Sequence, residues 1–221
     1  WSTGIPLQVV PRASVDEVPV LSPGYGLSAV AVGDVFPWAF VPPVTYWDGA
    51  SVVLKYISDG DLSSLEGQKL VFLHLDHPYG KEPIPFLEKM ADDYGFELVT
   101  VPVGLKQMQN QSSQWLQIRR ERLDWVVMWG WGAMNAGAVN EAVKTRFDMD
   151  RMIGVWWSSH DDDLETVGAK GKGYKALTYN LPKTDSPLIQ DIEKHVVEPG
   201  LSKIGDEDTV NKVFYQRGLV I

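Results

Sequence analysis

The feature that most constrains the fold is a strand–turn–helix pattern, which occurs three times in succession. Residues 69–75 form an apolar run that predicts a buried strand, and residues 82–94 then carry apolar side chains at helical spacing. Further strands are predicted at 96–102, 124–129, 151–157 and 174–179, and further helices at 113–123 and 133–146. Because parallel strands need helical crossovers, residues 45–180 are predicted to form an α/β fold with a doubly wound parallel sheet.

The segments outside this pattern are less regular. Residues 1–17 contain Gly4, Pro6 and Pro11 and are predicted to be a loop. Thr45 is predicted to cap a helix over residues 46–57, and Gly95 and Ser112 to end and begin other helices. Short strands at 18–21 and 35–40, a helix at 186–197 and a helical stretch near 207–216 complete the prediction.

Composition excludes several classes of function. The 221 residues carry a net charge of −9, which argues against nucleic acid as a partner. There is no cysteine, so disulfides, thiolate metal sites and cysteine nucleophiles are absent. No apolar run approaches the roughly 20 residues of a membrane span. The sequence opens at Trp1 without a basic signal pattern, so we expect a processed chain or a fragment.

Two polar clusters invite a metal interpretation. His74, Asp76 and His77 stand at a strand end, but no partner with metal-ligand spacing accompanies them, so turn polarity and helix capping are the preferred interpretation. The run from His160 to Asp163 is interpreted as a solvated helix start, where carboxylates are favoured by the helix dipole. We therefore expect no metal and no cofactor.

Glycine and serine motifs do not indicate catalysis. Residues 168–173 lack the Lys-Ser/Thr helix start of a phosphate loop, and residues 24–26 lack the third glycine of a dinucleotide fingerprint. Ser158 and Ser159 precede His160, but the nucleophile elbow of serine hydrolases is missing. The sequence thus favours a protein that is not an enzyme.

Aromatic residues gather at the predicted strand ends. The chain has nine tryptophans, and core packing is the expected role of Trp115 and Trp125. The rings at strand ends are those of Tyr79, Trp129, Trp131, Trp156 and Trp157. Since ligands of open parallel sheets bind at the carboxyl ends of the strands, these five residues are predicted to line a pocket.

The order of several short motifs resembles the solute-binding proteins of branched-chain amino acid-type ABC importers, which have the type I periplasmic binding fold. Residues 1–4 (WSTG) and 18–28 (VPVLSPGYGLS) are similar to the two ligand loops of the first lobe. Tyr79-Gly80 follows the first strand of the second lobe. Residues 171–174 (GKGY), with Tyr179-Asn180 after them, resemble the crossing back to the first lobe.

This resemblance implies a two-lobed clamp that closes on a ligand. Residues 1–43 would be part of lobe 1, residues 44–180 the complete lobe 2, and residues 181–221 a return segment into lobe 1. The chain would then be a fragment that holds one complete lobe and part of another.

The resemblance also implies roles for individual residues. A ligand carboxylate would be held by Ser2, Thr3, Gly24, Tyr25, Gly26 and Ser28, and the second lobe would supply Tyr79, Trp129 and Trp131. Where amino-acid binders of this type place an acid for the ligand's ammonium, residues 155–158 read Val-Trp-Trp-Ser. A buried unpaired ammonium is costly. We therefore expect a ligand with a carboxylate or amide on an apolar or aromatic body that stacks on tryptophan. Molecules like branched-chain or aromatic amino acids, and aromatic acids, belong to this class.

The implied function is that of an extracytoplasmic or periplasmic component of an ABC importer, which binds a small molecule and delivers it to a membrane permease. The chain would be a monomer or a weak dimer. Two alternatives remain open from sequence: a ligand-sensing regulator of the same fold, and a serine hydrolase that uses Ser158 or Ser159 with His160.

Overall fold

The computed structural model describes residues 3–22, 26–178 and 187–201 of the chain. The chain divides into two compact units, Trp1–Leu177 and Thr178–Ile221. The first unit contains both β-sheets of the described residues. The predicted lobe boundaries near residues 43 and 180 stay a prediction.

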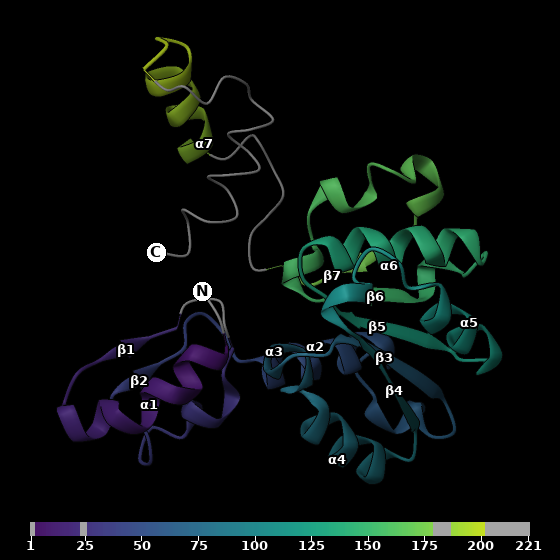
Figure 1. Cartoon of the computed structure of the whole chain (residues 1–221), viewed down its shortest axis with the longest axis horizontal. Coiled ribbons are helices and arrows are strands. Elements are labelled where there is room, and N and C mark those ends of the chain that lie inside the picture. The colour runs from purple at the N-terminus through teal and green to yellow at the C-terminus, as the bar shows by residue number, and fades with distance from the viewer. Residues whose placement is uncertain (1–2, 23–25, 179–186, 202–221) are drawn as a thin grey trace. The chain divides into compact units, whose positions relative to one another are not determined.

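A five-stranded parallel sheet in the order β4-β3-β5-β6-β7 forms the centre of the first unit (Figure 1). Its strands are β3 (Lys69–Leu75), β4 (Glu97–Val103), β5 (Trp125–Trp129), β6 (Met152–Gly154) and β7 (Lys175–Ala176). The chain places β4 on one side of β3 and β5 on the other. The strand order therefore reverses next to β3, as a doubly wound α/β fold requires, and this confirms the predicted fold class.

Helices cover both faces of this sheet. They are α2 (Tyr46–Ile57), α3 (Pro78–Lys81), α4 (Ile84–Tyr94), α5 (Ser112–Arg120) and α6 (Ala133–Lys144). Helices α5 and α6 contact each other, as do α2 and α4, and Figure 1 shows α4 and α6 on opposite sides of the sheet. Residues 70–75 of β3 are all buried, as a strand covered on both faces should be.

Two of the three helix caps predicted from sequence are present in the structure. The Thr45 side chain accepts a hydrogen bond from the Asp48 N–H, and the Asp48 side chain accepts one from the Thr45 N–H. The predicted cap is thus confirmed, and it is a capping box. Gly95 ends α4 in the left-handed conformation, as predicted. The prediction for Ser112 is wrong: it is the first helical residue, and the preceding Gln111 has no side-chain capping bond.

The prediction of a loop over residues 1–17 is also wrong, because Gly4–Asp16 forms helix α1. Pro6 stands in the first turn, where the backbone N–H has no helical partner to lose. Pro11 removes one hydrogen bond, but burial of Val10 and Ala13 on one face of the helix offsets this loss.

Helix α1 lies beside a small two-stranded parallel sheet, β1 (Val20–Leu21) with β2 (Ala39–Phe40). Both strands are shorter than predicted. Val10, Leu27 and Val30 form a small apolar cluster there, with Phe36 packed against it.

The predicted strand 151–157 is too long, because β6 ends at Gly154. The Ser158 N–H then donates to the Val155 carbonyl, and Trp156–Ser158 form a 3₁₀ turn. A side chain at Gly154 would overlap the hydroxyls of Tyr174 and Ser158, which shows how tightly this turn packs on the strand. Trp156 and Trp157 therefore lie in a turn after the strand rather than in it.

Short 3₁₀ turns connect many of the other elements. They are η1 (Ser28–Ala31), η2 (Leu62–Leu65), η3 (Leu105–Gln107), η4 (Met149–Arg151), η6 (Asp161–Leu164) and η7 (Gly168–Gly171), with η5 at Trp156–Ser158. The acidic helix predicted to begin at Asp161 is thus a 3₁₀ turn.

The second unit contains α7 (Pro187–Ile192), which continues into a π-helical turn, Glu193–Val197. This agrees with the predicted helix from Pro187 onward, whereas Ser186 and the helical stretch predicted near 207–216 lie outside the described residues. In the part of the chain that the structure describes, no helix has the length and apolarity that a membrane span needs.

Candidate ligand-binding site

The carboxyl ends of β3 and β5 meet where the strand order reverses, which is where open α/β sheets bind their ligands. Tyr79 follows β3 and Gly130 follows β5. The Tyr79 hydroxyl donates a hydrogen bond to the Gly130 carbonyl over 2.8 Å. This bond joins the two strand ends directly at the expected position of a ligand site.

Local sequence fixes the position of Tyr79. His77 caps the short helix α3 by accepting a hydrogen bond from the Tyr79 N–H, and Pro78 takes the first helical position. A side chain at Gly80 would overlap the Leu75 carbonyl, so only glycine lets this turn fold back onto the strand. The Tyr79-Gly80 pair thus has a clear structural basis.

Four aromatic rings form one cluster beside this junction. Tyr46, the first residue of α2, stacks on Trp156 with ring centroids 5.2 Å apart and planes 12° apart. Tyr46 also meets Tyr79 edge to face at 5.2 Å and Trp129 at 5.9 Å. All four rings are buried, and Trp129 is fully so. Sequence reasoning predicted three of these residues and missed Tyr46, at their centre, because it precedes β3 and was interpreted only as a helix start.

Trp157 and Trp131 are placed differently from these rings. The indole N–H of Trp157 donates to the Tyr46 hydroxyl over 3.1 Å, and the Trp157 side chain is half-buried. Trp131, just after β5, is 51% exposed. The structure therefore brings Tyr79, Trp129, Trp156 and the half-buried Trp157 together around Tyr46. Trp131 is exposed instead.

A polar group that sequence reasoning missed lies next to Trp157. The side chain of Asn135, in the first turn of α6, donates to the Trp157 carbonyl over 2.8 Å and to the Asp163 carboxylate over 3.2 Å. Asn135 is 2% exposed, and its side-chain oxygen has no hydrogen-bond partner among the described residues. Burial raises the pKa of Asp163 to about 6. The only sequence signal was its position three residues after Gly132.

Thr3 is the predicted ligand residue of the first loop that the structure describes, since Ser2 lies outside the described residues. It is 1% exposed and precedes helix α1. Its hydroxyl has no hydrogen-bond partner in the described part of the chain. An unused hydroxyl at the start of a 13-residue helix suits an anionic ligand group.

In the second predicted loop, Gly24 and Tyr25 lie outside the described residues, whereas Gly26 and Ser28 pack against the start of α2. The Gly26 carbonyl accepts from the Tyr46 N–H over 2.6 Å. The Ser28 hydroxyl donates to the Gly26 carbonyl and accepts from the Trp47 N–H. The Ser28 N–H donates to Glu82 over 2.7 Å, and burial raises the pKa of this glutamate. Ser28 therefore already has protein partners, and its role toward a ligand stays a prediction.

The residues considered for catalysis have other partners. The Ser158 hydroxyl donates to the Val155 carbonyl over 2.8 Å, and the Ser159 hydroxyl to the Trp156 carbonyl over 2.7 Å. The ring of His160 accepts from the Asp162 N–H, so neither serine is paired with it. Ser158, Ser159 and His160 therefore do not have the geometry of a nucleophile and its base.

The suspected metal ligands also have other roles. The buried ring of His74 stacks on Phe72, and Asp76 pairs with Lys81. His77 caps a helix, as the preferred interpretation predicted. In residues 3–22, 26–178 and 187–201, no group of His, Cys, Asp and Glu side chains could hold a metal ion.

Residues 1–201 match the family described as periplasmic binding protein. The chain belongs to the periplasmic binding protein family. A structure from the Pseudomonas fluorescens group, described as an ABC transporter permease, is 34% identical, with a TM-score of 0.85 over 96% of this chain. No curated protein matches the sequence.

Two more distant structures share the fold of this periplasmic binding protein chain. A branched-chain amino acid ABC transporter protein from Thermus thermophilus with bound valine is 19% identical, with a TM-score of 0.80 over 99% of this chain. A solute-binding protein from R. palustris in complex with benzoate is 17% identical, with a TM-score of 0.67 over 95%. The chain spans about half of each, covering 52%, 55% and 56% of their lengths. The family consists of binding proteins, not enzymes, and the R. palustris structure is described as a solute-binding protein.

Proposed function

We propose that the protein is an extracytoplasmic solute-binding component of an ABC importer, which holds a small carboxylate- or amide-bearing ligand between two lobes and passes it to a membrane permease. The observation that carries this proposal is the hydrogen bond from Tyr79 to Gly130 at the reversal of strand order, beside a cluster of aromatic rings. Residues 44–180 would form one jaw of this clamp, and Thr3, with its unused hydroxyl, would belong to the other.

An aromatic acid is the ligand class that the site favours. Residues 155–158 supply no carboxylate, and the nearby Asp163 is hydrogen-bonded to Asn135. A ligand ammonium would thus lack a dedicated partner, and burying it unpaired is costly. Trp131 and Trp157 instead offer indole surface for stacking. One structural neighbour holds benzoate and another valine, so both ligand classes occur on this fold.

Calorimetry on the full-length protein tests the proposal with benzoate, phenylacetate, leucine and valine as ligands. We expect the aromatic acids to bind more tightly, and we expect Trp131→Ala to weaken their binding by about tenfold, since a stacked ring contributes roughly 0.5–1.5 kcal/mol beyond its buried area. Leu116→Ala, which truncates a side chain of similar exposure on α5, should leave the affinity unchanged. Tight binding of leucine and valine without aromatic acids would overturn the assigned ligand class.

A further inference from the structure

A pocket lies at the amino ends of β5 and β6, at the edge of the five-stranded sheet opposite the proposed ligand site. It has a volume of about 560 Å³, and it is lined in part by Leu123, two residues before β5, and by Arg151, which directly precedes β6. The proposed ligand site is at the carboxyl ends of the strands, so the two sites are separate. A volume of this size is in the range of small-molecule sites.

Arginine dominates the charge of this pocket. Arg119, Arg122, Arg146 and Arg151 line it, and the only acid in its lining is Asp148. Arg151 pairs with Asp148 at 3.6 Å and with Asp124 at 3.9 Å. Within the described residues the other three arginines form no ion pair. Like charges gathered without counter-charges repel one another, and a bound anion would relieve this repulsion.

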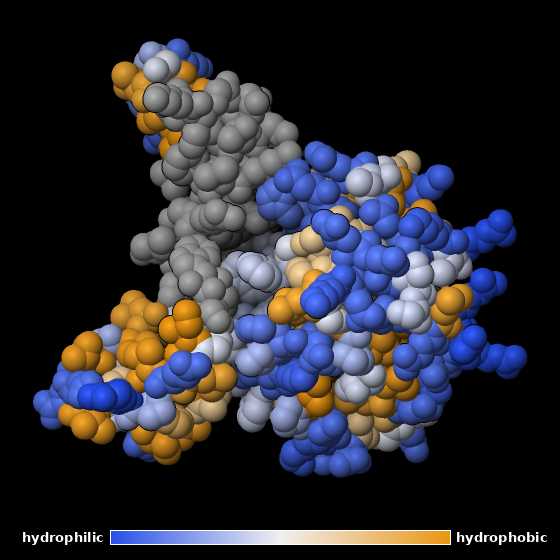
Figure 2. All heavy atoms as spheres, in the orientation of Figure 1, coloured by the Kyte–Doolittle hydropathy of each residue, from blue (hydrophilic) through white to orange (hydrophobic). Residues whose placement is uncertain are grey.

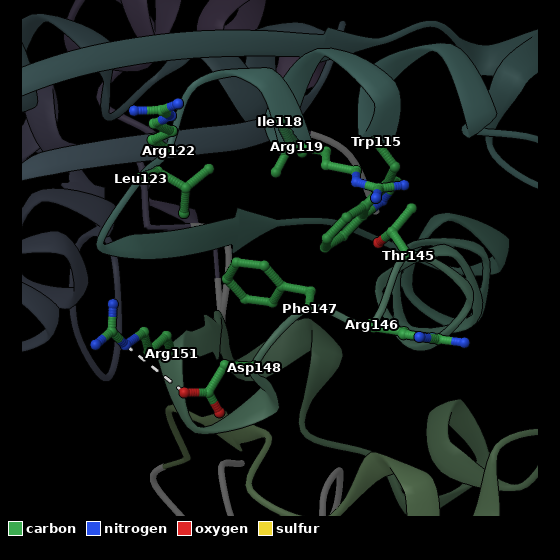
Figure 3. A pocket seen from close by; sticks show the side chains of 10 residues that line it. All are labelled: Trp115, Ile118, Arg119, Arg122, Leu123, Thr145, Arg146, Phe147, Asp148 and Arg151. Carbon is green, nitrogen blue, oxygen red and sulfur yellow. Dashed lines mark ion pairs between the residues drawn. The ribbon is translucent and has the colours of Figure 1, made fainter.

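The middle of the pocket is apolar. Figure 3 shows Phe147 and Leu123 at the centre, with the four arginine side chains placed around them. Phe147 meets the fully buried Trp115 edge to face, with ring centroids 5.7 Å apart, and Ile118 is buried beside them. An apolar floor with guanidinium groups at its rim fits a ligand that has both an apolar body and an anionic group.

Two of these arginines occupy backbone positions that usually favour glycine. Arg122 has φ 49° and Arg146 has φ 57°, and they follow the ends of α5 and α6. After α4 the same left-handed stop is made by Gly95. A side chain in this conformation is strained, whereas glycine adopts it freely. Their side chains thus reach the pocket from positions where the backbone alone would prefer glycine.

We propose that this pocket binds a small organic oxyanion, a carboxylate or phosphate carried on an apolar body, at a site distinct from the ligand cleft. The apolar body packs on Phe147 and Leu123, and the oxyanion accepts hydrogen bonds from guanidinium groups at the rim, where Arg119, Arg122 and Arg146 stand on different sides of the pocket.

Photolabelling of the full-length protein with benzophenone-4-carboxylate tests this proposal. Mass spectrometry should locate the label in peptides covering residues 115–123 and 145–151. Arg122→Gly with Arg146→Gly removes two guanidiniums at positions where glycine relieves backbone strain, so the melting temperature should not fall. Labelling of these peptides should drop at least about tenfold, because hydrogen bonds to charged groups are among the stronger ones.

Three controls test whether labelling depends on the pocket arginines and on the negative charge of the probe, and which kind of anion the site prefers. Arg120→Gln removes an exposed arginine from the same helix that does not line the pocket, so labelling should persist. The neutral probe 4-(hydroxymethyl)benzophenone should not label these peptides. Stronger competition by phenyl phosphate than by benzoate would assign the site to phosphates, and the reverse order to carboxylates.

Absence of label from residues 115–123 and 145–151, or label in these peptides that the double variant retains, would overturn the proposal. Label in peptides that contain Tyr79 or Trp131 would instead report the proposed ligand site at the carboxyl ends of the strands. Arg119→Gln, at an ordinary helical position, serves the same purpose if the double variant fails to fold. A loss of label in this single variant supports the site, and undiminished label contradicts it.

Discussion

At the scale of single residues, Gly49 leaves room for the aromatic cluster because it has no side chain. A Cβ atom there would lie 2.7 Å from the ring of Trp156, which stacks on Tyr46. Alanine normally stabilises a helix interior relative to glycine. We nevertheless expect Gly49→Ala to lower the free energy of unfolding by about 1–2 kcal/mol, since overpacking a filled core forces side chains to shift.

Chemical denaturation followed by tryptophan fluorescence measures this effect. Gly33→Ala is the matched control, since a Cβ atom at Gly33 would have no neighbour within 4 Å. If Gly49→Ala proved as stable as the control, the packing of Trp156 against α2 would not be as described.

Asp163 should make stability depend on pH. Burial raises the pKa of its carboxyl from 3.8 to about 6, against the hydrogen bond from Asn135 and the charge of His160, while Asp162 adds to the rise. The folded state then binds more protons than the unfolded state between these two values. The free energy of unfolding should therefore decrease as pH rises from about 4 to about 6, by about 1 kcal/mol once solvent screening is allowed for, and change little from this cause above that range.

Denaturation curves at pH 4, 5, 6 and 7 check this prediction. Asp163→Asn should remove this part of the decline, whereas Asp92→Asn, at an exposed position on α4, should retain it. A decline of equal size in both variants would show that another group is responsible.

Sequence indicated the right edge of the sheet but not the partners of its residues. Tyr79 and Trp129 could be placed at strand ends because a seven-residue apolar run leaves little choice of register. Tyr46 joins them from a helix that precedes β3 by more than ten residues, and Asn135 meets Asp163 across 28 residues. Such pairings depend on tertiary packing, which periodicity does not encode.

At the scale of elements, the two predicted serine and threonine caps give a direct test of capping. Thr45 forms a reciprocal capping box, whereas the Ser112 hydroxyl donates to Asn110 just outside its helix. We expect Thr45→Ala to cost about 1 kcal/mol of stability, within the roughly 0.5–2 kcal/mol range of lost N-caps. Ser112→Ala should cost clearly less. Equal losses in urea denaturation would contradict the difference between the two helix starts.

The same local signals explain which elements could be predicted. Strands β3, β4 and β5 and helix α6 follow a clear pattern of apolar residues. Helices α2 and α4 add a capping box and a glycine stop to such a pattern, so their local and periodic signals agree. Helix α1 contains two prolines that argued against it, and packing of its buried face decides otherwise. Strand β6 ends at Gly154 because the chain then turns tightly, with Ser158 packed on Gly154. Residues 155–157 in this turn are apolar, so their sequence looks like a continuation of the strand.

At the scale of the whole molecule, exposed apolar side chains are concentrated in one region. Sixteen large apolar residues of the described chain are exposed, and nine of them lie between residues 5 and 40. Figure 2 shows the corresponding apolar surface over α1, β1 and β2. The chain spans about half of the solved structures that it matches. Since soluble proteins rarely expose large apolar patches, we predict that this surface associates with other protein.

Leu21 and Phe40 give the sharpest test of this inference. They are paired across β1 and β2, and they are 66% and 49% exposed. The 221-residue chain by itself should associate at micromolar concentration and bind Nile red through this face. The double variant Leu21→Glu, Phe40→Glu should reduce both, because charged side chains at an open sheet block association. Leu105→Glu with Leu116→Glu, at isolated positions 60% and 52% exposed, should reduce neither. Sedimentation velocity compares the two double variants with the unsubstituted chain. If the unsubstituted chain is monomeric, or if both pairs of substitutions have the same effect, the β1–β2 face does not drive association.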